Sequence, residues 1–476
     1  MKRVFTILPA LLAALFLVIT PALANPFDTE KLTIRQENEM GSNFDIILRS
    51  QMPMVGDTYI TDYVGEVVAR VMTGKRPMPF RVKSAVVSNP LLNAFAIPGG
   101  FIYVFTGLIQ AVKTESQLAG VIAHELAHVS QRHVASRLEK QKKISLLSTA
   151  GVLAGLLLGV AGGGENAAKM GSAIMMGSTG AATAAMLQYS QEDEREADHV
   201  GLNSLVKAGY NPEGLPQTFE IMMKNRWFDT SSQMPSYLST HPGTSERITY
   251  LNDRIARMPK TLLDRKDNNE RLKKIQVLVR SKMSPAETAL AYWNDKPKTE
   301  YTPMDYMGLG VTLQRLKRSD DALKAFQKAL SLDGEDAIIV REAGIFYFKT
   351  GEQKRAFSLL QKAVIKNKRD ALALFYLARL QSEAKQYVQA ATNMRKVAKL
   401  VPEDWEVHYQ LGMILGESGD IFGGNLHLAY SAAYSMDLGK ARRHYQQAEH
   451  LAQSEDQKAE LKELDEVIKM RSKIKK

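Results

Sequence analysis

Two histidines and a glutamate stand close together at residues 124–128, in the pattern H-E-L-A-H. His124 and His128 are four residues apart, so on an α-helix they lie on one face, one turn apart. Two imidazoles placed in this way can bind a single Zn²⁺ from one side. Glu125 lies beside the metal, where it can take a proton from a zinc-bound water. The pattern predicts a hydrolytic zinc site.

An acidic run further along the chain, Q-E-D-E-R-E-A-D-H-V at residues 191–200, offers the missing ligand. A catalytic zinc with two histidine ligands needs a third protein ligand, commonly a carboxylate. Glu194 and Asp198 share a helix face because they are four residues apart. We assign Glu194 as the third ligand and Asp198 as the acceptor that orients a ligand imidazole. Each pattern alone is also typical of a solvated, charged helix face, but together they favour a metal site.

His133 provides a contrast within the same segment. It follows His128 by five residues, which places it about 140° around the helix from that ligand. We therefore do not expect His133 to bind the metal.

The order H-E-L-A-H and then E-R-E-A-D resembles the zinc endopeptidases that include the CAAX-prenyl protease and HtpX. Residues 93–108 resemble the strand-turn-strand that precedes the metal helix in that family, and residues 238–242 resemble its later H-P segment. The resemblance covers about residues 35–257 and supports Glu194 over its acidic neighbours. It implies a gluzincin-type metallopeptidase domain of α+β class, mostly α, with a small sheet and one Zn²⁺ per subunit.

The H-P segment adds two residues whose roles stay open. His241 has three possible roles. It is an additional zinc ligand that keeps the enzyme inactive, a group that stabilises the oxyanion, or only a packing residue. A fourth protein ligand would block the open position that catalysis needs. Arg247, six residues on, either hydrogen-bonds to the developing oxyanion or forms an ordinary salt bridge.

The N-terminus and the composition indicate an exported protein. Two basic residues precede an apolar run, and small residues near position 24 are typical of a signal peptide over residues 1–24. The alternative is an uncleaved membrane anchor. The chain has no cysteine, which excludes disulfides and thiolate zinc ligands and suits a bacterial periplasm. The net charge is +11, but no nucleic-acid motif accompanies it, so we expect no nucleic-acid partner.

The metallopeptidase domain is predicted over residues 25–258. Two amphipathic helices are expected in residues 27–75, then short strands at 80–87 and 91–105. A capping box at residues 114–117 predicts that the metal helix starts about ten residues before His124. An edge strand of the sheet is a candidate for binding extended substrate.

A stretch without charge at residues 145–161, and the Ala/Gly/Met-rich segment after it, separate the two metal motifs. About 20 apolar residues are needed to span a bilayer, so this stretch is marginal. We favour a helical hairpin near the site over membrane contact through residues 145–187.

After a transition segment at residues 259–300, small residues recur every 34 positions. Gly310, Gly344 and Ala378 keep this step, as do the small residues at 322, 356 and 390. This is the signature of tetratricopeptide repeats, which form an α-helical solenoid with a concave surface for protein partners. We assign it to residues 301–476. After Gly412 the next small pair is at 441 and 448, so we expect an extra helix and an irregular C-terminal cap.

An exported peptidase joined to such repeats resembles periplasmic quality-control proteases. That resemblance implies protein substrates, with outer-membrane assembly machinery and β-barrel clients as partners of the repeats. The main alternative is a chaperone or scaffold protein in which the zinc is structural or latent. An intramembrane protease that uses residues 145–187 is a third interpretation.

Overall fold

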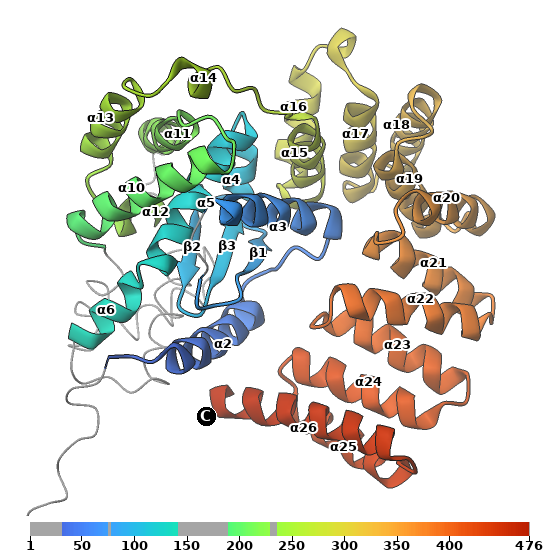
Figure 1. The fold of residues 1–476 in the computed structure, drawn as a ribbon. Coiled ribbons are helices and arrows are strands. Elements are labelled where there is room, and N and C mark those ends of the chain that lie inside the picture. The colour runs from blue at the N-terminus through green and yellow to red at the C-terminus, as the bar shows by residue number, and fades with distance from the viewer. Residues whose placement is uncertain (1–30, 75–77, 141–188, 229–235, 476) are drawn as a thin grey trace, which may run out of the picture.

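The computed structural model describes residues 31–74, 78–140, 189–228 and 236–475 (Figure 1). The expected signal peptide at residues 1–24 and the hairpin expected in residues 145–187 lie outside these residues. Among the described helices, none combines the length and apolar character that crossing a membrane requires.

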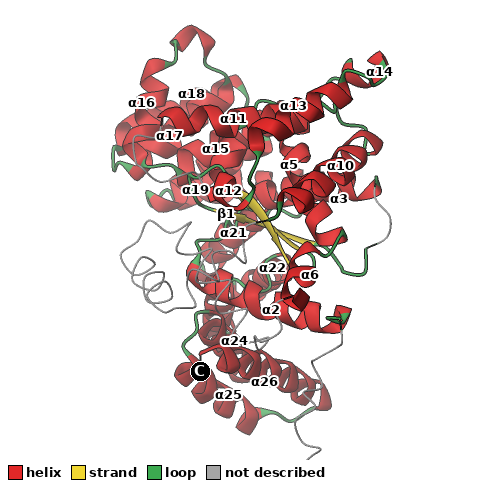
Figure 2. Cartoon of the chain, turned by 90° about the vertical axis from the view of Figure 1, so that its left-hand side faces the viewer, coloured by secondary structure: helices red, strands yellow, loops and turns green. Residues whose placement is uncertain are grey.

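The first half of the described chain surrounds a small sheet with helices (Figures 1 and 2). Its elements are α2 (Ile34–Gln51), α3 (Thr58–Thr73), β1 (Lys83–Val87), β2 (Ala94–Ile97), β3 (Phe101–Phe105), α4 (Thr106–Ala111), α5 (Glu115–Ser130), α6 (His133–Lys140), α10 (Gln191–Lys207), α11 (Gly214–Phe228), α12 (Ser236–Thr240) and α13 (Thr244–Ile255). The two helices and the strand regions expected from the sequence are confirmed, and the break that Pro98-Gly99-Gly100 predicts divides the second region into β2 and β3.

That break is a reverse turn between β2 and β3. Gly99 and Gly100 have φ values of +79° and +87°, which glycine adopts without the clash of a Cβ atom. The sheet has the order β1-β3-β2, with β1 parallel and β2 antiparallel to β3. β2 is therefore an edge strand of the sheet.

β2, β3 and the last three residues of β1 are buried, which explains why these parts of the sheet are largely apolar, whereas β1 begins with exposed Lys83. Phe44 and Leu48 of α2 pack with Tyr103 and Phe105 on one face. Val64 of α3 and several residues of α5 belong to the core on the other face. This second core positions the metal helix directly against the sheet.

The metal helix α5 begins where the sequence predicted. The Thr114 side chain accepts a hydrogen bond from the Gln117 backbone N–H, and the Gln117 side chain accepts from the Thr114 backbone N–H in return. The expected capping box is thus confirmed. It satisfies two backbone donors that the first turn of a helix otherwise leaves without partners.

The second half of the chain is helical. Its elements are α14 (Lys260–Leu263), α15 (Glu270–Met283), α16 (Ala286–Asp295), the 3₁₀ helix η1 (Lys298–Glu300), α17 (Pro303–Arg315), α18 (Ser319–Leu332), α19 (Ala337–Lys349), α20 (Gln353–Lys366), α21 (Ala371–Glu383), α22 (Tyr387–Leu400), α23 (Trp405–Glu417), α24 (Ile421–Tyr434), α25 (Leu438–Leu451) and α26 (Glu455–Lys475). The predicted tetratricopeptide-like solenoid is confirmed.

Small residues let the paired helices approach closely. A Cβ atom added to Gly310 would lie 3.0 Å from the Phe326 ring, and one added to Gly344 would lie 2.9 Å from Leu360 Cγ. Both distances are shorter than ordinary side-chain contacts. The 34-residue step therefore marks the places where successive helices touch.

The expected break of register after Gly412 is wrong. α23 and α24 begin 34 residues after α21 and α22, so they form a regular fourth pair. Gly424 occupies the next small position, and a Cβ atom there would lie 3.2 Å from the Gly412 carbonyl oxygen. The predicted extra helix is present, but it is the second member of that pair rather than an insertion.

The solenoid curves from α15 around to α26, whose end lies near α2 (Figure 1). One hydrophobic core runs from α5 through α15 into α19 and contains Ile122, Leu278 and Phe346. A polar contact also joins the two halves, because buried Arg341 of α19 forms an ion pair with Asp57, the N-cap residue of α3. The solenoid is thus packed against the peptidase-like half.

Candidate metal centre

The metal helix α5 presents both histidines of the H-E-L-A-H motif to the protein interior. His124 and His128 are almost completely buried, and their Nε2 atoms lie 3.0 Å apart. Two imidazole nitrogens this close face a common point, as their spacing on the helix predicted.

α10 brings the carboxylate of Glu194 to the same point. Its side-chain oxygens lie 3.4 Å from the Nε2 atoms of His124 and of His128. The close approach of the two helices depends on Gly201, because a Cβ atom there would lie 3.1 Å from the Cα atom of His124. The structure therefore places Glu194 where a third ligand would be.

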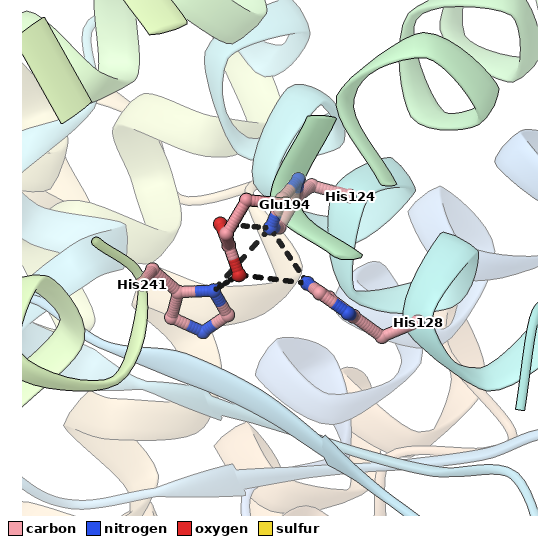
Figure 3. A group of neighbouring side chains, drawn as sticks. All are labelled: His124, His128, Glu194 and His241. Carbon is pink, nitrogen blue, oxygen red and sulfur yellow. Dashed lines mark hydrogen bonds and ion pairs between the residues drawn. The ribbon is translucent and has the colours of Figure 1, made fainter. Parts of the chain in front are cut away.

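His241 completes the cluster from the other side (Figure 3). It directly follows α12, and its Nδ1 lies 2.8 Å from Glu194 Oε1 and 3.4 Å from His124 Nε2. The ligand atoms of His124, His128, Glu194 and His241 all lie within 4.8 Å of one another.

These four side chains fit a zinc ion. Ligand atoms at about 2.0–2.1 Å from a tetrahedral ion are about 3.3 Å apart, close to the 3.0–3.4 Å that separates the imidazole nitrogens. Histidine and glutamate are also the donor types that zinc prefers when no cysteine is available. Burial holds the pKa of His128 well below its ordinary value, which favours the neutral form that a ligand needs.

Behind the cluster, Asp198 and Arg247 form a buried layer of charge. Asp198 Oδ1 lies 2.9 Å from His124 Nδ1, and the Arg247 guanidinium binds both Asp198 oxygens at 2.7 and 2.8 Å. Arg247 also contacts Glu194, and Tyr250 donates its hydroxyl to Asp198. Although burial opposes ionisation, Arg247 lowers the pKa of Asp198 and keeps it charged. A carboxylate here orients the His124 ring and fixes its tautomer.

His133 contacts a candidate ligand from outside the cluster. Its Nδ1 lies 2.8 Å from the Nδ1 of His128, and its Nε2 lies 3.3 Å from Glu196 Oε2. Glu196 is exposed on α10, so the two residues form a polar chain that leads from His128 to the surface.

Glu125 lies within the cluster, and neither of its carboxylate oxygens hydrogen-bonds to another side chain in the described part of the chain. The His241 imidazole lies close to it, with Nε2 3.6 Å from Glu125 Oε1. Burial raises the pKa of Glu125, although the neighbouring histidines and the Ala96 backbone oppose that shift. A buried carboxylate without a side-chain partner is costly in a structural role, so its position calls for a functional one.

Two tyrosines that no sequence pattern indicates enclose the histidine rings. Tyr189 stacks on His128 with ring centroids 3.7 Å apart, and Tyr237 stacks on His241 at 4.2 Å. Both lie just outside the motifs, and neither belongs to a spacing that could be recognised. They hold the two imidazoles in fixed planes.

Comparison with known proteins finds a family that this region resembles. Residues 57–255 match the description "Peptidase family M48". Over these residues the chain is similar to the peptidases of that family. The match confirms the resemblance to metallopeptidases, and zinc is the metal of this family.

Three characterised relatives illustrate the similarity. The chain is 30% identical over 249 residues to the beta-barrel assembly-enhancing protease of Escherichia coli (strain K12), and the aligned region covers 50% of each protein. It is 31% identical over 228 residues to the putative beta-barrel assembly-enhancing protease of Vibrio cholerae, covering 48% of this chain and 46% of that one. It is 33% identical over 166 residues to the mitochondrial metalloendopeptidase OMA1 of Arabidopsis thaliana, covering 35% and 30%. The chain thus spans about half of the length of the first two relatives and 30% of the length of the third.

Solved structures match about a third of the chain. MamA is 18% identical with a TM-score of 0.29, covering 33% of this chain and 91% of that one. YrrB, described as "a TPR protein with an unusual peptide-binding site", is 20% identical with a TM-score of 0.30, covering 36% and 89%.

Proposed function

We propose that the chain is a zinc-dependent endopeptidase. The observation that carries this proposal is the buried Glu125 carboxylate, which among the described residues has no side-chain hydrogen-bond partner and lies beside four side chains that fit one zinc ion. The M48 domain match supports it.

In this mechanism, His124, His128 and Glu194 would hold a zinc ion, which when bound would supply Lewis acidity and lower the pKa of a water to about 7. Glu125 accepts the proton of the attacking water and then passes it to the leaving amine. Its raised pKa suits both steps, because a base with a pKa closer to the working pH exchanges protons more readily. Asp198 keeps the His124 ring in place throughout.

The edge strand β2 is the candidate site for the substrate backbone. It pairs with β3 on one side only among the described strands, and it packs against the metal helix. An extended peptide could add to this edge by strand pairing. This would lay a scissile bond alongside the metal centre.

The zinc requirement tests the proposal directly. Purified protein is expected to contain one Zn²⁺ per chain and to cleave an unfolded protein such as reduced, alkylated lactalbumin. Removal of the metal with a chelator should abolish cleavage, and added Zn²⁺ should restore it, because the Lewis acid is part of the reaction. Metal content and cleavage are measured on the same samples. Full cleavage by metal-free protein would contradict the proposal.

We further propose that His241 is an inhibitory fourth ligand. Its Nδ1 lies among the other ligand atoms, and four protein ligands leave no open position on a tetrahedral zinc.

For Arg247, the contacts to Asp198 and Glu194 favour the salt-bridge role over the oxyanion role. Both of its neighbours are carboxylates that a guanidinium must neutralise in the interior.

Substitution of His241 by alanine is expected to raise the initial cleavage rate, because three ligands still hold zinc and one position opens. The rate is measured on the unfolded substrate together with zinc content. His450, which is exposed on α25, provides a matched histidine-to-alanine control. A lower rate in His241→Ala would instead assign the residue to catalysis, and an unchanged rate and zinc affinity would remove both roles.

For the whole protein, we propose a periplasmic role in the quality control of outer-membrane β-barrel proteins, with the repeats binding clients or assembly machinery. The names of the relatives support this proposal. The competing scaffold function predicts that a chain without peptidase activity still performs the cellular role. The two are separated by complementation with an inactive variant.

A further inference from the structure

The two histidines of the H-E-L-A-H motif differ in the group that lies behind each ring. Both rings turn their Nε2 atoms toward the cluster, and these two atoms lie 3.0 Å apart (Figure 3). The Nδ1 atom of His124 meets the Asp198 carboxylate at 2.9 Å. The Nδ1 atom of His128 instead meets a third imidazole, the ring of His133, whose Nδ1 atom lies 2.8 Å away. His133 therefore occupies behind His128 the place that a carboxylate occupies behind His124.

His133 reaches this place because the metal helix ends before it. α5 ends at Ser130, and α6 begins at His133. Between them Arg132 has a φ of +56°, a left-handed conformation that residues other than glycine adopt only where their surroundings stabilise it. Buried Glu37 of α2 stabilises the turn here, since its carboxylate accepts a hydrogen bond from Arg132 Nε at 2.6 Å. The turn brings the His133 ring back against His128.

These contacts determine which nitrogen of each ring carries the hydrogen. A neutral imidazole that binds a metal through Nε2 carries its hydrogen on Nδ1. The His128 Nδ1–H group then needs an acceptor, and His133 Nδ1 provides it when the His133 hydrogen is on Nε2. That Nε2 atom lies 3.3 Å from Glu196 Oε2, which accepts in turn. We therefore assign a chain of hydrogen bonds that are donated outward, from the candidate ligand to the surface.

This arrangement adds no further negative charge to the interior. Glu194 and Asp198 are already buried at the cluster, and Arg247 contacts both of them. His133 is also almost completely buried, but its neutral ring can accept a hydrogen bond without carrying a charge. The carboxylate at the end of the chain belongs to Glu196, whose side chain is 49% exposed. Water there reduces the cost of its charge, so His128 gains an oriented partner without a second buried carboxylate.

We propose that His133 is a positioning residue for the metal centre. It fixes the tautomer and the plane of the His128 ring and thereby sets the affinity of the site for zinc. Loss of such a partner behind a ligand histidine typically costs about 10–100-fold in metal affinity. In this role His133 is not itself a ligand. The inference rests on the metal centre of the proposed function, but it does not require the chain to cleave peptides.

The zinc affinity of the full chain tests the proposal without any measurement of cleavage. The parent chain, His133→Asn and His133→Phe compete for Zn²⁺ with a chromophoric chelator of known affinity. Asparagine Oδ1 can accept the same hydrogen bond as histidine Nδ1, because both atoms are bonded to Cγ. His133→Asn is therefore expected to bind zinc nearly as tightly as the parent chain. Phenylalanine offers a ring of similar shape without an acceptor, so His133→Phe is expected to bind zinc about 10–100-fold more weakly.

This order of affinities distinguishes orientation from packing. A ring that only filled space would be replaced well by phenylalanine and poorly by asparagine, which is the opposite order. His450→Phe, on the exposed surface of α25, is the matched control and should leave the affinity unchanged. Circular dichroism of the metal-free chains shows whether each variant is folded. The proposal is overturned if folded His133→Phe binds zinc as tightly as the parent chain, or as tightly as His133→Asn.

The tautomers provide a second measurement, made on the parent chain. In the zinc-loaded protein labelled with ¹⁵N-histidine, nitrogen chemical shifts distinguish a ring that carries its hydrogen on Nδ1 from one that carries it on Nε2. His128 is expected in the Nδ1–H form and His133 in the Nε2–H form. A neutral His133 ring in the Nδ1–H form could not accept from His128. That result would overturn the proposal even if both variants failed to fold.

The outcome is separable from that of the peptidase proposal. The expected order of zinc affinities in a chain that never cleaves would support the positioning role of His133 and contradict only the peptidase function. Zinc-dependent cleavage by a parent chain whose zinc affinity equals that of His133→Phe would do the reverse.

Discussion

Replacement of Glu125 by glutamine is expected to lower the turnover of an unfolded protein by about 10²–10⁴-fold. The carboxylate lies beside the candidate ligands without being one of them, and it can carry a proton. The amide keeps the size of the side chain but cannot accept that proton at neutral pH. Since Glu125 is not among the four grouped ligands, the variant should retain its zinc and its fold.

Zinc content, circular dichroism and the initial cleavage rate check this expectation. Glu192→Gln is the matched control, because Glu192 is exposed on α10 and points away from the cluster. Retained proteolysis in Glu125→Gln would remove this residue as the base. The same variant decides between the proposed peptidase and a scaffold, since only a scaffold would keep its cellular role without the carboxylate.

Replacement of Arg341 by methionine is expected to lower the free energy of unfolding by about 3–5 kcal/mol. Arg341 is completely buried. It donates to Asp57 at 2.8 and 3.0 Å, to Glu342 at 2.7 Å and to Asp370 at 3.3 Å. Methionine fills a similar volume, but among the described residues it leaves Asp57 and Glu342 with Lys282 as their remaining ion-pair partner and Asp370 with none. Removal of one member of a buried charge network costs far more than loss of a surface ion pair.

Urea denaturation measures the effect, with Arg355→Met as the control. Arg355 pairs with Glu352 at 2.8 Å on the exposed face of α20, and its loss should cost at most about 1 kcal/mol. An equal shift of the two midpoints would contradict the prediction.

The penalty in Arg341→Met should also depend on pH. Burial opposes ionisation of Asp57 and Glu342, but Arg341 and Lys282 hold the pKa of both below the ordinary value. A lowered folded-state pKa stabilises the protein above the unfolded-state pKa, and this contribution is lost as the pH falls through the folded-state value. The difference between the parent chain and the variant should therefore be largest near neutral pH and shrink below about pH 4.

Much of the metal centre could be predicted because its spacing is local. His124 and His128 lie on one face of any α-helix that contains them, and so do Glu194 and Asp198. The repeat region could be read for the same reason, since each small residue marks a contact between neighbouring helices. Alanine spacing does not reveal the fourth helix pair, because the small residues at its repeat positions are Gly424 and Ser431.

Other features of the structure could not be predicted from the spacing of residues in the sequence. Nothing in the sequence signals that His133 contacts His128, or that Tyr189 and Tyr237 stack on the candidate ligands. The meeting of Arg341 with Asp57, 284 residues away, depends on how far the solenoid curves.

The sequence by itself determined the helical faces that carry the metal motifs and the repeat period, because both follow from backbone geometry over a few turns. The tertiary structure alone decided which faces meet, how His241 reaches the cluster and which buried charges pair. Those outcomes depend on the packing of segments that are distant in the chain, where burial and electrostatics act on the whole assembly of helices.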